Sequence, residues 1–422
     1  MELGLFFTMQ LPRPWHAAAE QRAFRDALQQ VELAERLGFD AVWVVEQHFL
    51  EEYSHSSAPE VFLAAASQRT TRIRLGHGVV LLPPPYNAPA RVAERIATLD
   101  LVSDGRVEFG IGDSKSRIEL EGFGIAPEER RAMSVEALAQ VADMLVMEPY
   151  PGHAGPHVTM PARNVVPKPV QKPHPPLWMA CSDDASMREA ARMGIGVLAH
   201  TFFDEAEARR AVAEYRSTFE RECNPIGHVV NPRVAMLAPF FCSRDETACD
   251  AALDAFGFLT FAVRHYYSFG RHVPGRTNLW ERFEAVRAEL GGKVPWRGAH
   301  AVGTPERVAT YLRGLEAAGV DQVIFSHQAG TMDHDVICES LELFAREVLP
   351  AFSSGRAHDG SSERMTAAAP PTRRRRTDVE IPAVDAYGRS RPDPDPSEFP
   401  PQAREQLIEL QRVKEIAMRL DA

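Results

Sequence analysis

Two short apolar runs of the chain end in residues that can bind a ligand or transfer a proton. One run is followed by Glu46, Gln47 and His48, and another ends in Gly110 and Gly112. A carboxylate and an imidazole can hold protons, an amide can hydrogen-bond, and glycine allows a ligand to approach the backbone. In parallel α/β proteins the binding groups gather where strands end. We therefore expect both places to belong to an active site.

Two other places carry side chains suited to a small-molecule pocket. His77 lies in a further apolar run, and His265, Tyr266 and Arg276 lie in a segment that mixes aromatic and basic residues. Such side chains can stack on a ring or hold a carbonyl group, which favours a substrate pocket. The other interpretation is that the aromatic residues pack this segment onto the rest of the fold.

The elements that must position these residues alternate between two hydrophobic periods. Short β-branched or aromatic runs alternate with amphipathic helical segments. The seven predicted helical segments are 22–37, 90–102, 134–147, 185–193, 205–221, 305–318 and 336–348. This alternation predicts an α/β fold, a (β/α)8 TIM barrel with insertions, because parallel strands need crossover helices and a barrel leaves no sheet edge. An open doubly wound sheet is the alternative. The eight predicted strands are 3–8, 41–45, 73–80, 106–111, 177–180, 196–199, 234–241 and 323–326.

Two spans are longer than a minimal barrel requires, and the composition changes near residue 353. The spans are the Pro-rich 149–176 and the aromatic 256–295, and the second favours a pocket wall. We assign 1–352 to the barrel, 353–401 to a flexible linker that includes a solvated run of arginines, and 402–422 to an amphipathic C-terminal helix. That helix either docks on the barrel or pairs with another chain.

The composition of the chain limits the classes of molecule that the protein is expected to bind. With 422 residues, 45% hydrophobic and 25% charged, the chain can bury a large core, and its net charge of −11 disfavours nucleic acid. The absence of a long apolar stretch and of a basic, apolar start predicts a cytoplasmic protein that does not contact membranes. Five cysteines without a Cys-x-x-Cys pair predict free thiols and no metal site. A small organic molecule is the expected ligand.

Several motifs, in this order and spacing, resemble the bacterial luciferase-like family of flavin-dependent monooxygenases. The motifs are 43–49 (Trp-Val-Val-Glu-Gln-His-Phe), 75–79 (Leu-Gly-His-Gly-Val), 89–94, 99–106 with the glycine-rich strand that follows, 182–194 and 340–350. The resemblance covers residues 1–352. It implies a (β/α)8 barrel that binds reduced FMN from a separate NAD(P)H-dependent flavin reductase. The flavin then reacts with dioxygen, through a 4a-hydroperoxide, to oxygenate a small substrate. A homodimer is also implied.

The resemblance also implies where the flavin lies. Members carry a cis peptide bond, here between Gly78 and Val79, beneath the flavin ring, and glycines at Gly110 and Gly112 would let the ring approach the backbone. For these two glycines, tight strand–helix packing is the alternative explanation. Gln328, which follows the last strand, is also expected to point toward the flavin.

The flavin phosphate is expected at the start of the helix near residue 185. Ser182, Ser186 and the backbone of Met187 could hold it, because a helix N-terminus favours anions; N-capping by Ser182 is the alternative. Many relatives have an arginine where this chain has Asp113, so Lys115 or Arg117 is expected to offset the carboxylate in binding the phosphate.

For catalysis, the resemblance points to Glu46, Gln47 and His48. Luciferases have a pair of histidines here, and this chain has Gln47 in place of the first, which is the one tied to catalysis. An amide can hydrogen-bond but cannot transfer a proton. A purely structural role for His48 is the alternative. Two further functions stay open, a deazaflavin-dependent oxidoreductase of the same fold and a non-catalytic barrel subunit that binds no flavin.

Overall fold

Eight parallel strands close into a barrel in the computed structural model, which describes residues 1–353 except 200–202, 270–271 and 290–299. Neighbouring strands pair in parallel, and the last gap closes where β8 pairs with β9. The predicted barrel is therefore confirmed, and the open sheet is excluded. The strands are β1 (Glu2–Phe7), β2 (Ala41–Val44), β3 (Arg74–Leu81), β4 (Val107–Gly112), β7 (Leu177–Cys181), β8 (Gly196–Ala199), β9 (Val234–Cys242) and β11 (Gln322–Ser326).

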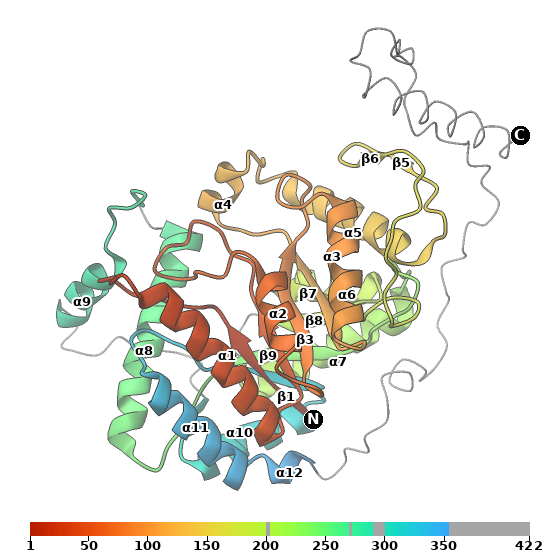
Figure 1. Ribbon diagram of the computed structural model, residues 1–422. Helices are drawn as coiled ribbons and strands as arrows, with labels where there is room; N and C mark the ends of the chain where they lie inside the picture. The colour runs from red at the N-terminus through yellow and green to blue at the C-terminus, as the bar shows by residue number, and fades with distance from the viewer. Residues whose placement is uncertain (200–202, 270–271, 290–299, 354–422) are drawn as a thin grey trace, which may run out of the picture. The chain divides into compact units, whose positions relative to one another are not determined.

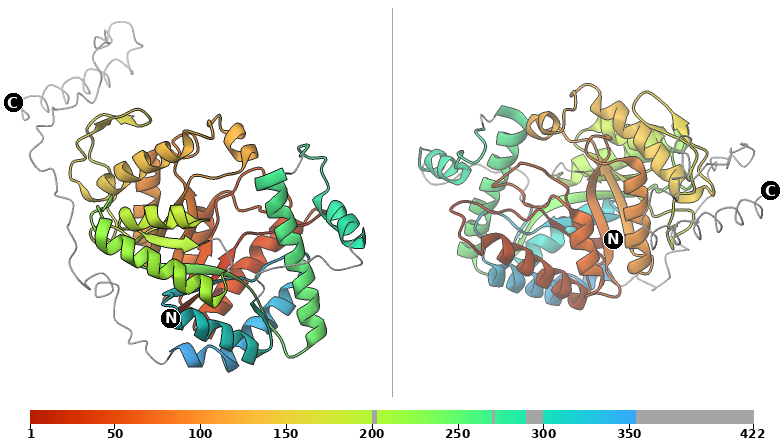
Figure 2. Two further views of the ribbon diagram at one scale, coloured as in Figure 1. Left: turned by 180° about the vertical axis from the view of Figure 1, so that it is seen from behind. Right: turned by 45° about the horizontal axis from the view of Figure 1, so that its top comes forward.

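Helices surround the strands on the outside (Figures 1 and 2). Seven of them match the predicted amphipathic segments: α1 (Ala19–Leu37), α3 (Pro89–Val102), α5 (Arg130–Val146), α6 (Asp184–Arg192), α7 (Glu205–Glu222), α10 (Pro305–Ala317) and α11 (His334–Glu347). The sequence interpretation did not include α2 (Pro59–Ser67), α4 (Arg117–Gly122), α8 (Glu246–Arg264), the π-helical turn η1 (His265–Phe269), α9 (Leu279–Glu289), α12 (Pro350–Ser353) or the short strand β10 (Ala301–Gly303).

Large side chains fill the interior of the barrel. Trp43 and Trp178 meet edge to face with 5.5 Å between ring centroids, and both are fully buried. Each ring lies over a glycine of a neighbouring strand: a Cβ on Gly76 would come within 2.3 Å of Trp43, and one on Gly196 within 2.5 Å of Trp178. The glycines are therefore required by packing, because a methyl group has no room there.

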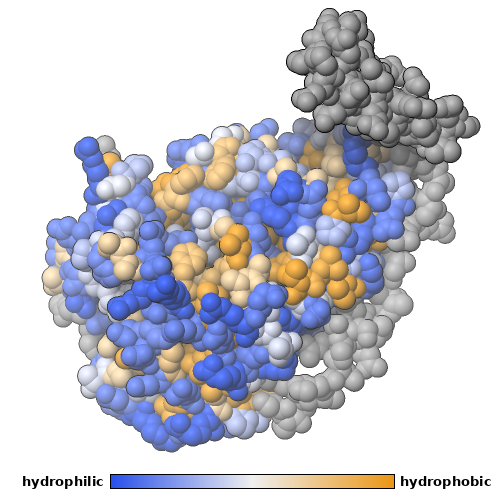
Figure 3. All heavy atoms as spheres, in the orientation of Figure 1, coloured by the Kyte–Doolittle hydropathy of each residue, from blue (hydrophilic) through white to orange (hydrophobic). Residues whose placement is uncertain are grey.

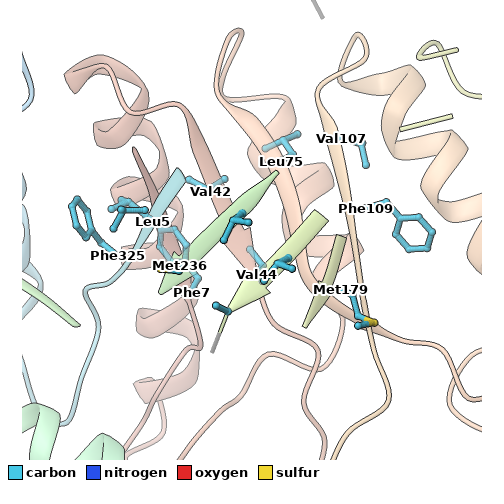
Figure 4. Packing of buried hydrophobic residues seen from close by; sticks show 14 of the residues in the cluster. Leu5, Phe7, Val42, Val44, Leu75, Val107, Phe109, Met179, Met236 and Phe325 are labelled. Atoms are coloured by element: carbon cyan, nitrogen blue, oxygen red, sulfur yellow. The ribbon is translucent and has the colours of Figure 1, made fainter. Parts of the chain in front are cut away.

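A second apolar layer lies between the strands and the helices. Because successive strand residues face opposite sides, Leu5 and Phe7 point toward the helices while Phe6 points into the barrel. Figure 4 shows Leu5 beside Phe325, its partner in the parallel register of β1 and β11. Packing of the outward-facing residues against the helices therefore determines which residues of each strand point into the barrel.

The Pro-rich span lies at the opposite end of the barrel from the strand ends that carry polar residues. It connects α5 to β7 and contains a small antiparallel pair, β5 (His153–Ala154) and β6 (Thr159–Met160). Gln171 in this span bonds to Asp100 at 2.7 Å and accepts from Arg74 at 3.0 Å. Since Arg74 begins β3, the span packs at the amino ends of the strands.

The surface shown in Figure 3 is mostly hydrophilic, with separate apolar patches. Across the described residues, none of the helices is both long and apolar enough to cross a bilayer. The predicted linker 353–401, except for its first residue, and the predicted helix 402–422 lie outside the described residues.

Candidate active site

A cavity of about 370 Å³ opens at the carboxyl ends of the barrel strands. Residues within or directly after β1, β2, β3, β4, β7, β9 and β11 line it, together with parts of α4, α8 and η1. This is the end of the barrel where the sequence predicts the active site. Its wall includes Phe6, Thr8, Val45, Glu46, Gln47, Tyr53, Gly78, Val79, Leu81, Gly112, Asp113, Ser114, Lys115, Glu119, Ser182, Leu237, Leu259, Thr260, Val263, Tyr267 and Ser326.

Glu46 is a buried carboxylate of the cavity wall with its oxygens occupied. Oε2 accepts from the Leu81 backbone at 2.8 Å, and Oε1 accepts from Asn87 Nδ2 at 2.8 Å. His48 Nε2 lies 3.2 Å from Oε1. These contacts hold the carboxylate at one place between β2 and β3.

Gln47 also lines the cavity, and its amide contacts a tyrosine from the aromatic span. Its Nε2 donates to Tyr267 Oη at 3.1 Å, whereas its Oε1 is buried without a partner among the described atoms. Burial raises the pKa of Tyr267 well above its ordinary value, so that hydroxyl stays protonated. The Gln47 side chain thus contributes to the cavity wall an acceptor atom, Oε1, that has no hydrogen-bond donor among the described residues.

His48, by contrast, does not line the cavity. Its ring stacks on Tyr86 at 5.9 Å and meets Phe123 edge to face at 5.0 Å, while its backbone N–H donates to Glu119 at 2.8 Å. The expectation that His48 faces the cavity is therefore wrong. Its position is that of a residue that orients Glu46 and anchors the loop after β2.

The peptide bond between Gly78 and Val79 is cis, and both residues line the cavity. Gly112 also lines it, and a Cβ there would come within 2.5 Å of Val79. Gly110 does not line it; a Cβ on Gly110 would meet the His77 carbonyl oxygen at 2.1 Å. For Gly110 the structure thus supports the packing alternative rather than contact with the cavity.

His77 points away from the cavity. It alternates with Gly76 and Gly78, which face the barrel interior, so its ring lies on the helix side, edge to face with Phe109. Burial lowers the pKa of His77 to about 4, so the ring is neutral. The predicted pocket role is wrong for this residue.

One end of the cavity carries a cation and a hydroxyl. Lys115 Nζ lies 2.5 Å from Ser182 Oγ and 3.5 Å from Asp183 Oδ2, and about half of the Lys115 side chain is exposed. Both Lys115 and Ser182 line the cavity. Their role in binding a phosphate stays a prediction.

The N-cap of α6 is one residue later than the sequence suggested. Asp183 accepts from the Ser186 backbone at 2.8 Å, and the Ser186 side chain returns to Asp183 in a capping box. Ser186 is therefore occupied in the cap. Met187 is buried in the core and its N–H donates within the helix, so neither residue lines the cavity.

Two arginines offset Asp113, and neither was among the predicted residues. Arg130 Nη1 lies 2.5 Å from Asp113 Oδ2, and Arg131 Nη1 lies 3.8 Å from it. Burial raises the pKa of Asp113, and these arginines together with Lys115 oppose that shift. Arg117, which was predicted to offset the charge of Asp113, is exposed and pairs with Glu121.

Glu119 on α4 is a cavity residue that the sequence interpretation missed. It is 1% exposed, and its oxygens accept from Ser114 Oγ at 2.5 Å and from the His48 backbone at 2.8 Å. Burial raises the pKa of Glu119 to about 7. The surrounding sequence reads as a charged surface segment, so no local pattern indicated a buried carboxylate.

The aromatic span does form part of the wall, through residues other than those predicted. Tyr267 contacts Gln47, while His265 and Tyr266 pack in a cluster with His272, and Arg276 is exposed. Gln328 bonds to Gln30 outside the cavity. The packing alternative thus describes His265 and Tyr266, and the pocket interpretation describes the neighbouring tyrosine.

The family model of luciferase-like monooxygenases matches residues 1–322. The chain belongs to this family. This luciferase-like monooxygenase is similar to the oxygenase component of the flavin-dependent trigonelline monooxygenase of Acinetobacter baylyi. The two are 23% identical over 368 residues, 84% of this chain and 97% of that protein. The resemblance stated from the motifs is therefore confirmed, and the chain is a flavin-dependent oxygenating enzyme.

Two solved structures share the fold of this luciferase-like monooxygenase and differ in cofactor. One is the oxygenating constituent of 3,6-diketocamphane monooxygenase from Pseudomonas putida in complex with FMN, with a TM-score of 0.64, 20% identity, and coverage of 83% of this chain and 98% of that one. The other is a coenzyme F420-dependent secondary alcohol dehydrogenase, with a TM-score of 0.63, 20% identity and the same coverage.

The residues of the cavity fit a flavin. Its wall is apolar at Phe6, Val79 and Leu237, which suits a flat ring, and Lys115 with Ser182 supplies a cation and a hydroxyl for an anionic tail. The pairing of Asp113 with Arg130 removes the repulsion expected for a phosphate.

Proposed function

We propose that this luciferase-like monooxygenase binds reduced FMN, supplied by a separate flavin reductase, and uses dioxygen to oxygenate a small organic substrate. The observation that carries the proposal is the cavity itself. It combines an apolar wall with a cationic end at Lys115 and Ser182, at the carboxyl ends of the strands. The trigonelline enzyme, described as an oxygenase component, supports a partner that supplies the reductant.

When bound, the flavin would supply the electrons and activate the oxygen, and the protein would bind, orient and exclude water. Lys115 and Ser182 would hold the phosphate through charge-assisted hydrogen bonds. Gly112 and the Gly78–Val79 segment offer backbone with little side chain between it and the ring. Leu237, Leu259 and Val263 line the remainder with carbon, which keeps water away from the reacting atoms.

Two carboxyl groups lie in the wall of the cavity, and hydrogen bonds hold both in place. Glu46 is kept in position by Leu81 and Asn87, and Glu119 by Ser114 and His48. With a pKa of about 7, Glu119 can accept or return a proton near neutral pH, which is the property a general acid or base needs.

The test uses anaerobic titration followed by mixing with oxygen. Protein titrated with reduced FMN under argon should saturate, and bound flavin mixed with oxygen should regain the visible absorbance of oxidised FMN more slowly than free flavin does. A parallel titration with coenzyme F420 tests the second candidate, which rests on the likeness to the secondary alcohol dehydrogenase. Saturation by F420 alone would overturn the proposal. Failure to bind either cofactor would instead favour a non-catalytic subunit.

A further inference from the structure

Two polar atoms of the cavity wall have no partner among the described residues. Thr8 is 2% exposed, and its Oγ1 is buried without a hydrogen bond. Gln47 Oε1 is buried and unpaired in the same way, although its Nε2 contacts Tyr267. Buried polar atoms are nearly always hydrogen-bonded, so unpaired ones in a cavity wall mark positions where a ligand group or a water molecule can bind.

The two atoms belong to one sector of the cavity. Thr8 follows β1 and Gln47 follows β2, and these strands are paired in parallel with Phe7 opposite Val44. Lys115 and Ser182 follow β4 and β7, with β3 between the two pairs of strands. The unpaired atoms therefore lie apart from the groups proposed to hold the flavin phosphate.

Their chemistry selects the group they can bind. The Gln47 Oε1 atom is an acceptor only, whereas the Thr8 hydroxyl can donate as well as accept. A ligand hydroxyl can donate to the first and accept from the second. A ketone offers no donor to Gln47, and a hydrocarbon leaves both atoms unpaired, which costs binding free energy.

The charges of the wall around Gln47 disfavour anionic substrates. Glu46 and Glu119 both line the cavity, and Lys115 is the only lysine or arginine among its described lining residues. Lys115 lies beside Ser182 and Asp183 at the other end. A substrate carboxylate near Gln47 would thus meet like charge in a largely apolar surrounding.

We propose that the cavity binds a neutral alcohol or phenol on an apolar skeleton, whose hydroxyl donates to Gln47 Oε1 and accepts from Thr8 Oγ1. This inference rests on the proposed function, because it names the substrate class of the same site. It makes Gln47, the residue that replaces the luciferase histidine, a substrate-binding acceptor instead of a proton carrier.

The experiment compares three probes that differ in one substituent on a methylated ring: p-cresol, p-xylene and p-toluate. Their binding is measured by isothermal titration calorimetry, first on flavin-free protein and then on protein saturated with FMN. We expect p-cresol to bind about tenfold more tightly than p-xylene in both cases, equal to one net hydrogen bond of about 1.4 kcal/mol. We expect p-toluate to bind more weakly than either.

Two nearly isosteric variants assign the preference to the named atoms. Thr8→Val and Gln47→Met should each reduce the tenfold preference for p-cresol and leave p-xylene affinity unchanged. Gln328→Met is the matched control, because Gln328 Oε1 is also buried and unpaired but lies outside the cavity wall. It should keep the full preference. Thermal unfolding of each variant checks the fold, and either site variant alone suffices for the test.

Several results would overturn the inference without touching the proposed function. These are equal affinities for p-cresol and p-xylene, tightest binding of p-toluate, or a preference that survives both site variants. Loss of p-cresol binding on saturation with FMN would assign the two atoms to the cofactor instead. Conversely, a normal p-cresol preference in a protein that fails to bind FMN would retain the hydroxyl-binding site and overturn the proposed function.

Discussion

Glu119 is the residue whose environment departs furthest from that of a surface carboxylate. Its pKa of about 7, against an ordinary 4.5, means that the folded protein holds a proton there which the unfolded chain releases at lower pH. Between those two values the unfolded state binds fewer protons, so the stability contributed by this group falls as the pH rises. The charged form is tolerated only because Ser114 and His48 donate to it.

Replacing Glu119 by glutamine should remove this pH dependence. A glutamine can accept from the His48 N–H and donate to Ser114 Oγ, so the fold is retained. Relative to the variant, the wild type should lose roughly 3 kcal/mol of unfolding free energy between pH 4.5 and pH 8, as measured by urea denaturation. Glu121→Gln, on the exposed side of the same helix, is the control. Identical pH profiles for wild type and Glu119→Gln would contradict the buried carboxylate.

Lys115 supports a second prediction at the scale of one residue. If it binds the flavin phosphate, Lys115→Met should weaken FMN binding by about tenfold or more, because a charge-assisted hydrogen bond is lost. Riboflavin, which has no phosphate, should bind with unchanged affinity. Both constants can be measured from the quenching of flavin fluorescence. Arg117→Met should change neither, since that side chain is exposed and lies outside the cavity wall; an equal loss for FMN and riboflavin would point to damage rather than phosphate binding.

At the scale of elements, the loop after β2 holds the start of α9. Glu52 is fully buried and accepts from the backbone N–H groups of Leu279 and Trp280, and from Arg13 N at 2.9 Å. The helix α9, which lies within the aromatic span, thereby gains a carboxylate partner for its first N–H groups. This contact fixes the segment that carries the wall residue Tyr267 against the barrel.

Glu52→Ala should therefore destabilise the protein by about 2–4 kcal/mol, because it leaves buried N–H groups without acceptors. Urea denaturation gives the magnitude, and hydrogen exchange should show lost protection at the start of α9. Glu281→Ala, on the exposed face of that helix, provides the comparison and should be nearly neutral. Unchanged exchange at Leu279 and Trp280 would mean that Glu52 does not hold this helix.

At the scale of the whole molecule, the closed barrel depends on how its interior is filled. Trp43 occupies the space above Gly76, and Trp178 the space above Gly196. The two rings contact each other, so one interior cluster joins strands from opposite parts of the chain. Closure is possible because large and small residues alternate between neighbouring strands.

Gly76→Ala should destabilise the barrel by about 1–3 kcal/mol, since the new methyl group would overlap the Trp43 ring. In a Trp43→Phe background the same change should cost less, because phenylalanine lacks the benzo carbons that approach Gly76. A double-mutant cycle of unfolding free energies measures this coupling. Strictly additive costs would show that the ring and the glycine do not share that space.

Much of the architecture could be predicted from the sequence. All eight predicted strands belong to the barrel. They could be predicted because the hydrophobic periods of strands and helices can be recognised within short stretches of sequence. The order of the motifs was sufficient to identify the family. Seven of the predicted site residues line the cavity: Glu46, Gln47, Gly78, Val79, Gly112, Lys115 and Ser182. Segments with weak periodicity, such as α2 and α4, were not predicted.

The tertiary structure alone decided which of several adjacent residues reaches the cavity. Beyond a strand end no period tells which way a side chain points, so Gln47 and Tyr267 face the cavity while His48 and Tyr266 pack beside it. Side-chain pairing with residues elsewhere in the chain could not be predicted from the sequence either. Arg130 neutralises the charge of Asp113, and Ser114 and His48 donate hydrogen bonds to the carboxylate of Glu119. Local patterning thus determines the barrel, whereas burial and long-range pairing determine the chemistry of its open end.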